Sequence, residues 1–221
     1  MTPPAQANYR HYLRAECAVF NKTKERFGGL SNMAGGFPLE VAGVRIRTSE
    51  ALYQACRFPH MPDLQREIID ERSPMAAKMR GKPFRSKSRG DWDEVRVALM
   101  RWTIRVKLVQ NPRTFEAVLE ETRDLPIVEH SRRDRFWGAV ALNDEELEGQ
   151  NVLGRLLMEL RQEMREAGGP EHLGPLQPVD IPDFSLFGSP IGIIRTQAGA
   201  RPVEPPDDEP PATTFVEQKL I

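Results

Sequence analysis

The chain has 221 residues, of which 39% are hydrophobic, and a formal net charge of −1. This size and composition suit one folded domain with an appendage rather than two full domains. The chain has no apolar run of about 18 residues, and its N-terminus does not resemble a signal peptide, so we expect a cytoplasmic protein without membrane contact.

The cysteines and histidines give no sign of a metal site. Cys17 and Cys56 are the only cysteines, and the four histidines are scattered along the chain. We therefore expect no metal, no disulfide framework and no cofactor. Cys56 is flanked by apolar helix positions, which favours a buried, small hydrophobic side chain.

Proline and charge divide the chain. Ten of the 19 prolines follow Gly169. From Pro170 onward there are eight acidic and three basic residues, against 24 acidic and 28 basic residues before it. We predict a flexible arm over residues 1–15, a catalytic domain over 16–169 and a Pro-rich acidic tail over 170–221, partly disordered or docked. The basic body favours polyanionic ligands such as nucleic acid or a pyrophosphate.

The first predicted elements are a hairpin and a helix. PLEV and VRIR alternate around Ala42-Gly43 and predict a β-hairpin. Thr48 or Ser49 can cap the helix that follows, which should end near Pro59. Its apolar band packs inward, and we expect the side that carries Glu50, Tyr53, Gln54 and Arg57 to be free for chemistry.

The remaining pattern is mainly helical. Asp91 and Glu94 should form a capping box for the longest helix, and Asn151 can cap the final one. Ile127 to Glu129 is a short extended segment. The longest helix should end near residue 110, and the final one should run from 152 to the Gly168-Gly169-Pro170 stop. Further helices are expected over 62–72, 74–79 and 112–122. The sequence thus predicts an α+β fold, mainly helical, with a small β-sheet and an extended C-terminal tail.

Two segments combine carboxylates with aromatic or amide side chains. TSEALYQ contains Glu50, and DRFWG contains Asp134. A site of this composition can stabilise positive charge on a sugar while it holds a flat base, which indicates N-glycosidic chemistry. Alternatively, Glu50 only stabilises the N-terminus of its helix. A second alternative is that Glu50 and Asp134 are both solvated surface charges.

Two of the three tryptophans are candidates for base stacking. Trp92 and Trp137 lie among charged residues, whereas Trp102 falls on an apolar helical stripe and is assigned to packing. The alternative is that Trp92 and Trp137 anchor their loops. FGGLSNM supplies Asn32, which can bond a sugar or a base. Lys78 begins a basic run suited to phosphate, although a solvated surface also explains such a run.

Seven segments occur in an order that resembles one known family. They are FGGLSNM, TSEALYQACRF, SPMAAKMRG, RGDWDEVRVALM, KLVQNP, IVEHSRRDRFWG and NVLGRLLMELR, and they span about Phe20 to Met164. In this order they are similar to the NADAR, or YbiA-like, family. The resemblance implies a mainly helical α+β fold and hydrolysis of N-glycosidic bonds, either in early riboflavin intermediates or between ADP-ribose and guanine.

The resemblance also implies the site. Glu50 and Asp134 become the leading catalytic groups. The ligand should be surrounded by Asn32, Tyr53, Arg57, Trp92, Trp137 and Asn151. Arg57 stands where a lysine is common in the family, so a route through a lysine imine would need Lys78, Lys22 or Lys24. An acidic loop, Ala141 to Asn151, replaces a glycine-rich stretch and bears on substrate identity.

We therefore expect a glycohydrolase that removes ADP-ribose from guanine in DNA, as an antitoxin to a neighbouring DarT-type ADP-ribosyltransferase toxin. Its partners would be ADP-ribosylated DNA or ADP-ribose. Cleavage of a riboflavin precursor is the enzymatic alternative, and a non-catalytic module that binds ADP-ribose or a toxin is the second. The apolar segment Phe184 to Ile194 could dock on a partner or on its own domain.

Overall fold

The computed structural model describes residues 8–195 and confirms a mainly helical α+β fold. The α-helices are α1 (Ser49–Ala55), α2 (Pro62–Asp70), α3 (Pro74–Arg80), α4 (Trp92–Gln110), α5 (Pro112–Glu121) and α6 (Val152–Ala167). The strands are β1 (Arg10–Leu13), β2 (Ala18–Phe20), β3 (Leu39–Val41), β4 (Val44–Ile46), β5 (Ile127–Glu129), β6 (Val140–Ala141), β7 (Glu146–Gly149), β8 (Ser185–Leu186) and β9 (Ser189–Pro190).

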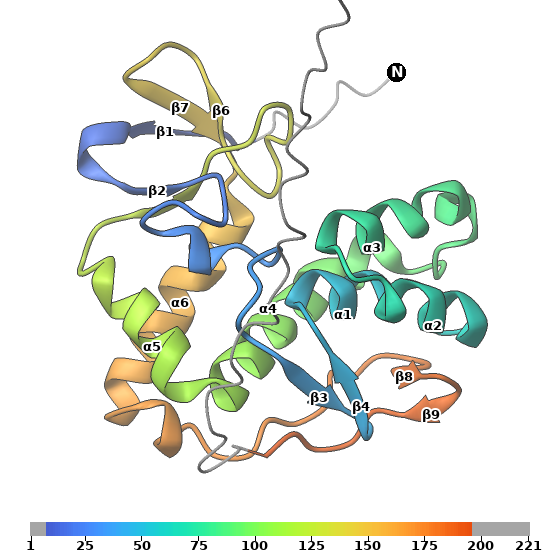
Figure 1. The fold of residues 1–221 in the computed structure, drawn as a ribbon. Coiled ribbons are helices and arrows are strands. Elements are labelled where there is room, and N and C mark those ends of the chain that lie inside the picture. The colour runs from blue at the N-terminus through green and yellow to red at the C-terminus, as the bar shows by residue number, and fades with distance from the viewer. Residues whose placement is uncertain (1–7, 196–221) are drawn as a thin grey trace, which may run out of the picture.

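Helix α4 is the centre of the fold. Figure 1 shows it between α1–α3 on one side and α5 with α6 on the other. Its predicted stripe, including Leu99, Trp102 and Val106, is buried. Polar Thr103 and Lys107 are buried as well, because neighbours cover the helix on more than one face. Packing around α4 thus joins helices α1–α3 to helices α5 and α6.

The sheets were largely absent from the sequence prediction. Strand β7 pairs antiparallel with β1 and β6, and β2 pairs in parallel with β5. Residues 10–13, which we expected in a flexible arm, are therefore strand β1. Most of the expected acidic loop is the β6–β7 hairpin, in which Asn143 Oδ1 accepts the N–H groups of Glu145 and Glu146 at 2.8 Å. The domain limits at 15/16 and 169/170 stay predictions.

The β3–β4 hairpin and the cap of α1 are confirmed. Ala42 and Gly43 have φ angles of 52° and 73°, as a two-residue type I′ turn requires. Thr48 Oγ1 accepts the N–H of Ala51 at 3.3 Å. The hairpin therefore leads directly into the helix that carries Glu50.

Two predicted side-chain caps are wrong, although the helices begin where expected. Asp91 is the N-cap residue of α4, but its carboxylate receives hydrogen bonds from Arg89 at 2.5 and 2.9 Å instead of capping the helix. Asn151 holds the N-cap position of α6, but its amide group bonds strand β5. In both cases a tertiary partner replaces the local backbone.

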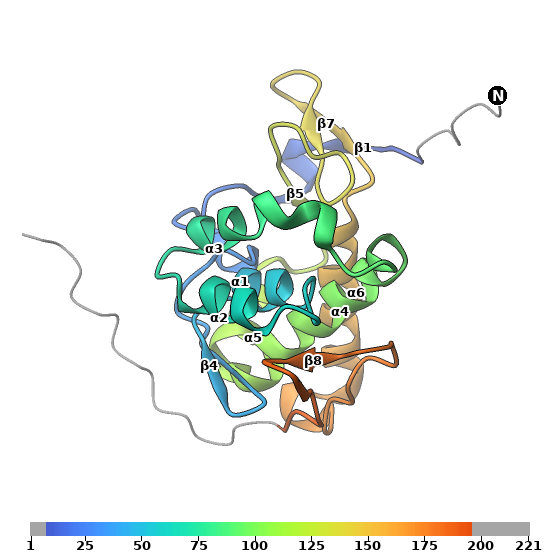
Figure 2. The same ribbon diagram turned by 90° about the vertical axis from the view of Figure 1, so that its right-hand side faces the viewer.

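The C-terminal segment within the described residues returns to its own domain. Leu186, Ile191 and Ile194 are buried in the main core. Gln65 of α2 binds β8 and the following turn through Ser185 O at 3.1 Å and the Phe187 N–H at 2.7 Å. Figure 2 shows this segment, coloured orange to red, across the base of the helical body. Of the two predicted alternatives for residues 184–194, docking on the domain is therefore observed.

Candidate active site

Glu50 lies in the first turn of α1 and is only 6% exposed. Its N–H donates to Asn32 O at 3.0 Å, and Gln54 Nε2 donates to its Oε1 at 2.9 Å. Burial raises the pKa of Glu50, while the charge of Lys78 and the Gln54 hydrogen bond oppose that rise. Of the helix face that we expected to be free, Glu50 and Tyr53 are buried, whereas Gln54 and Arg57 stay partly exposed. Glu50 is therefore a buried acid rather than a surface charge.

Glu129 is a second acid at this site, and sequence reasoning did not single it out. It ends β5, and burial raises its pKa to about 7. The charges of Asp134 and Glu50 raise that pKa further, whereas Lys78 lowers it. Three acids and one lysine from four separate segments therefore act on each other. A buried strand end with an acid was the available signal, but such a position is common in proteins.

Asp134 shapes the loop between β5 and β6. Its Oδ1 accepts the N–H groups of Phe136 and Trp137, each at 2.9 Å, and Ser131 Oγ accepts its own N–H at 3.0 Å. The Asp134 side chain is exposed, unlike the two glutamates. It thus orients Trp137 and contributes negative charge near Glu129.

Tyr53 joins the two candidate tryptophans. Its ring centroid lies 5.2 Å from that of Trp92 and 5.8 Å from that of Trp137. Trp92 is only 8% exposed and Trp137 is half-buried, so packing occupies part of the surface that we expected to be available for a base. Burial and the charge of Glu50 raise the pKa of Tyr53, so its hydroxyl stays protonated and can donate.

Several buried polar atoms around Glu50 are without a partner among residues 8–195. They are Asn32 Oδ1, Ser49 Oγ and Tyr53 Oη. A buried polar atom without a hydrogen bond costs about 1–3 kcal/mol, so such a group is usually satisfied by water or a ligand. Asn32 donates through Nδ2 to Met100 Sδ at 2.8 Å, which leaves its oxygen as the unsatisfied end.

Asn151 is not brought into this cluster as a ligand group. It is fully buried, its Oδ1 accepts the Glu129 N–H at 3.1 Å, and its Nδ2 donates to Ile127 O at 2.8 Å. The Asn151 amide therefore makes the hydrogen bonds to the β5 backbone that a neighbouring strand would make. Both polar ends are used, so this geometry suits a residue that positions Glu129.

Lys78 lies on α3 and is exposed, but its charge reaches both Glu50 and Glu129. The next basic residue, Arg80, pairs with Glu71 and lies 3.9 Å from Glu67. Arg80 is thus engaged and is a poor candidate for the phosphate contact that the basic run suggested. Within the part of the chain that the structure describes, no group of three or more His, Cys, Asp or Glu side chains could hold a metal ion.

The NADAR domain family model matches residues 19–165, about two thirds of the chain. The chain belongs to the NADAR family. It is 32% identical to the protein named N-glycosidase YbiA of Escherichia coli K12, over 73% of this chain and 97% of that protein. It is also 32% identical to the riboflavin biosynthesis protein VVA0006 of Vibrio vulnificus, over 66% of this chain but 38% of that protein.

A solved structure supports the same assignment. The NMR structure of E. coli YbiA matches with a TM-score of 0.58 and 30% identity, and covers 71% of this chain and 92% of that one. A chloroplastic riboflavin biosynthesis protein of Zea mays, PYRR, is 36% identical over 53% of this chain and 19% of its own length. The family match over residues 19–165 includes both Glu50 and Glu129.

The KLVQNP segment of this NADAR protein holds the backbone around Asn32 in place. Lys107 is 1% exposed, and its Nζ donates to Gly29 O at 2.5 Å and Ser31 O at 3.1 Å. Gln110 bonds both the N–H and the carbonyl of Glu40 at 2.7 Å. These contacts fix the backbone on both sides of Asn32, whose carbonyl accepts the Glu50 N–H.

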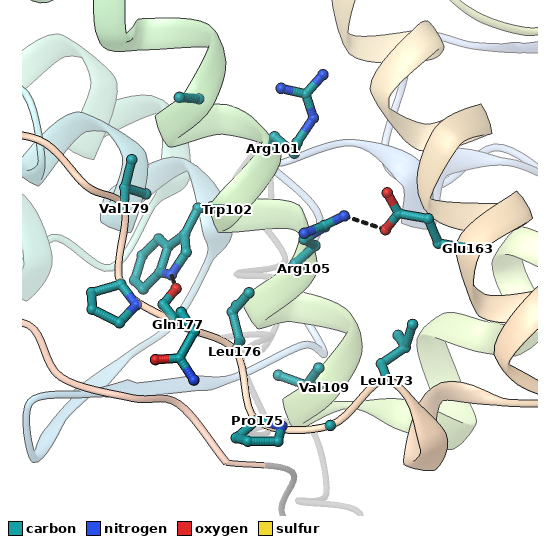
Figure 3. Close-up of a pocket in the computed structure, with 13 residues that line it drawn as sticks. Arg101, Trp102, Arg105, Val109, Glu163, Leu173, Pro175, Leu176, Gln177 and Val179 are labelled. Atoms are coloured by element: carbon teal, nitrogen blue, oxygen red, sulfur yellow. Dashed lines mark hydrogen bonds and ion pairs between the residues drawn. The ribbon is translucent and has the colours of Figure 1, made fainter.

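A cavity of about 470 Å³ lies elsewhere in this NADAR protein, between α4 and residues 173–179. Figure 3 shows Trp102, Arg105 and Leu176 in its wall and the ion pair between Arg105 and Glu163. Trp102 is buried in the core, which confirms the packing role predicted for that tryptophan, and its Nε1 donates to Gln177 O at 3.1 Å. The cavity shares no lining residue with the cluster around Glu50.

The described residues contain no helix that is long and apolar enough to cross a membrane.

Proposed function

We propose that this NADAR protein is an N-glycosidase that hydrolyses a bond between ribose and the nitrogen of a base. One observation carries the proposal: two acids with raised pKa values, Glu50 and Glu129, influence each other beside the aromatic pair Tyr53 and Trp137. Acids of this kind are what glycoside hydrolysis uses. The name of the E. coli relative, N-glycosidase YbiA, supports the same reaction class.

The two acids would have different roles. Glu129, with a pKa of about 7, retains a proton in part of the population at neutral pH and can donate it to the departing base nitrogen. As the bond between C1′ and that nitrogen breaks, positive charge develops on the sugar. Glu50 as a carboxylate, supported by Lys78, stabilises this charge and accepts a proton from the attacking water. The water oxygen becomes the new hydroxyl on C1′.

The neighbouring side chains would hold and orient the substrate. Tyr53 Oη and Asn32 Oδ1, both buried and unpaired among residues 8–195, offer a donor and an acceptor to the sugar. Trp137, half-buried beside Tyr53, presents the remaining surface for a base. Asp134 positions Trp137, and Asn151 positions Glu129 through their backbone bonds.

For the substrate, ADP-ribosylated guanine in DNA is the first candidate. Its support is the positive surface that begins at Lys78 and continues through exposed Lys82, Arg85 and Lys87 of 3-10 helix η3 (Lys82–Lys87). Such a surface can follow a phosphate backbone. In this proposal the protein reverses the product of an ADP-ribosyltransferase toxin and acts as its antitoxin.

A riboflavin precursor, a pyrimidine joined to ribose phosphate, is the second candidate. It is favoured by the names of the Vibrio vulnificus and Zea mays relatives, both riboflavin biosynthesis proteins. Both candidate substrates contain a ribose joined to nitrogen, so the acids described above would act on the same bond in each.

Separate incubations of the purified protein with an ADP-ribosylated guanine oligonucleotide and with the pyrimidine ribosyl phosphate test both assignments. We expect release of ADP-ribose from the oligonucleotide, and no release by the Glu50→Gln variant. Turnover of the pyrimidine alone would overturn the DNA assignment. Tight binding of ADP-ribosylated DNA without turnover of either substrate would overturn hydrolysis and indicate a binding module.

The role of Lys78 is tested by borohydride trapping during turnover. An exposed lysine next to two acids could form an imine with the opened sugar, or it could act by charge alone. We expect direct attack by water, and hence no adduct. An adduct that forms in the natural protein and is missing in Lys78→Arg would overturn direct attack and assign the imine to Lys78.

A further inference from the structure

Two arginines lie at the two ends of a continuous row of aromatic rings. Arg57 stacks on Trp92, with its guanidinium carbon 4.6 Å from the ring centroid, and Arg96 stacks on Phe136 at 3.8 Å. The row between them runs from Trp92 through Tyr53 and Trp137 to Phe136, with centroid distances of 5.2, 5.8 and 5.0 Å. Helix α1, the loop before β6 and helix α4 each contribute to it.

The two arginines also lie near each other, because Arg96 follows Trp92, on which Arg57 stacks, by one turn of α4. The charges of Arg57 and Arg96 both act on the Tyr53 hydroxyl, and the charge of Arg96 acts on Arg57. Burial and the nearby cations Arg85 and Arg96 lower the pKa of Arg57. Positive charges are therefore held close together within reach of the tyrosine that follows Glu50 by one turn.

These guanidinium groups have unused donors. Arg57 Nε donates to Ser88 Oγ at 2.6 Å, and among residues 8–195 its two Nη groups have no hydrogen-bond partner. Arg96 Nε is buried without a hydrogen bond in the same range. Asp93 lies 3.5 Å from that nitrogen, but its side chain is 86% exposed, so water weakens the pair. Stacked arginines with free planar donors suit a phosphate group, because two of its oxygens can accept two parallel hydrogen bonds.

We infer that Arg57 and Arg96 form the subsite for the phosphate on the ribose C5′ of the substrate. The inference rests on the proposed N-glycosidase function, in which Glu50 and Glu129 act on C1′ of the same sugar. A 5′-phosphate occurs in ADP-ribose and in a pyrimidine ribosyl phosphate alike, so one subsite serves both candidate substrates. This subsite lies on the aromatic row beside Tyr53 and is separate from the exposed lysine run, which would follow the phosphate backbone of DNA.

Paired substrates with and without the 5′-phosphate test this assignment through kcat/KM. Loss of a charge-assisted hydrogen bond corresponds to about a 10- to 100-fold effect. We expect Arg96→Gln and Arg57→Gln each to reduce kcat/KM by this factor for the phosphorylated ribosyl substrate, and by less than about threefold for its dephosphorylated form. Arg45→Gln, an exposed arginine on β4, is the matched control and should leave both unchanged. Equal losses on both substrates would overturn the subsite, because they would reflect damage to the fold.

Direct binding separates failure of the subsite from failure of the proposed function. Calorimetric titration with ribose 5-phosphate, with ribose as the control, requires no turnover. We expect binding of the phosphate form to the natural protein and at least about tenfold weaker binding to Arg96→Gln. If neither candidate substrate is hydrolysed but this difference is found, the function fails and the subsite stands. Equal affinity for ribose and ribose 5-phosphate overturns the subsite.

Discussion

Glu50 and Glu129 carry the same functional group, and yet the sequence pointed to only one of them. Glu50 follows a helix cap in a motif with Tyr53 and Gln54, so its place in the first turn could be inferred from local pattern. Glu129 is the last residue of a three-residue strand, and its backbone N–H is held by Asn151, which is 22 positions away. Contacts between such remote segments leave no periodic signal in one sequence.

The raised pKa of Glu129 predicts a pH-dependent stability. In the unfolded chain a glutamate titrates near 4.5, whereas in the native protein the pKa is about 7, so the native state binds more protons between these values. The contribution of this group is fully present below pH 4.5 and is lost as the pH rises through 7. The free energy of unfolding should fall by up to about 3 kcal/mol from this group, and by less where solvent reaches the carboxyl.

Urea unfolding of the natural protein and of Glu129→Gln at pH 4.5 and pH 8 measures this effect. The glutamine variant should lack this part of the loss, because its side chain does not ionise. A parallel pH dependence in the two proteins would contradict the pKa that we assign to Glu129.

At Glu50, removal of the charge should separate activity from stability. Glu50→Gln keeps the size of the side chain but cannot accept a proton, so we expect kcat to fall by about 100-fold or more. Because burial already disfavours the charged form of Glu50, the melting temperature should stay the same or rise. Glu40→Gln, an exposed position on β3, is the control for both measurements. A stable Glu50→Gln variant with full kcat would remove Glu50 from the mechanism.

At the scale of elements, helices were predictable and most strands were not. The long helices α4 and α6 have apolar stripes over several turns, and Pro74 and Pro112 mark helix starts. Strands β1, β2, β6 and β7 have two to four residues, too few for alternation to stand out. Only β3 and β4 were recognisable as a pair, because the Ala42-Gly43 turn joins them directly.

The buried amine of Lys107, near the C-terminal end of α4, should contribute to the stability of the protein. Lys107→Met should destabilise the protein by about 1–3 kcal/mol, because it leaves the carbonyls of Gly29 and Ser31 without their buried donor. Hydrogen exchange should also speed up at residues 28–32, which precede the contact with Glu50. Lys82→Met, at an exposed position, is the matched control in urea unfolding. Equal stability of the two variants would show that the buried amine does not support this turn.

At the scale of the whole molecule, residues 173–195 are part of the folded body. Leu186 is 1% exposed in the main core, whereas Ile193 is 51% exposed a few residues later. The prolines marked this segment in the sequence, but composition does not show whether its apolar residues pack on the domain. The segment is held on the body by Gln65 of α2 and Trp102 of α4, whose side chains donate to its backbone carbonyls.

Paired truncations within this segment test its contribution. Leu186→Ala should lower the free energy of unfolding by about 2–4 kcal/mol, because it leaves a cavity in the core. Ile193→Ala should change it by about 0.5 kcal/mol or less, since that side chain is largely in water. Thermal unfolding followed by circular dichroism measures both. A similar small effect of the two substitutions would mean that the segment adds little to the stability of the fold.

The distribution of the three indole rings has a spectroscopic consequence. Trp92 and Trp137 both contact Tyr53, whereas Trp102 packs against Phe184 and donates to Gln177 O in the C-terminal segment. A nucleoside that enters beside Tyr53 would alter the emission of two fluorophores and leave the third as an internal reference. Occupancy of the protein could then be followed in real time without any attached dye.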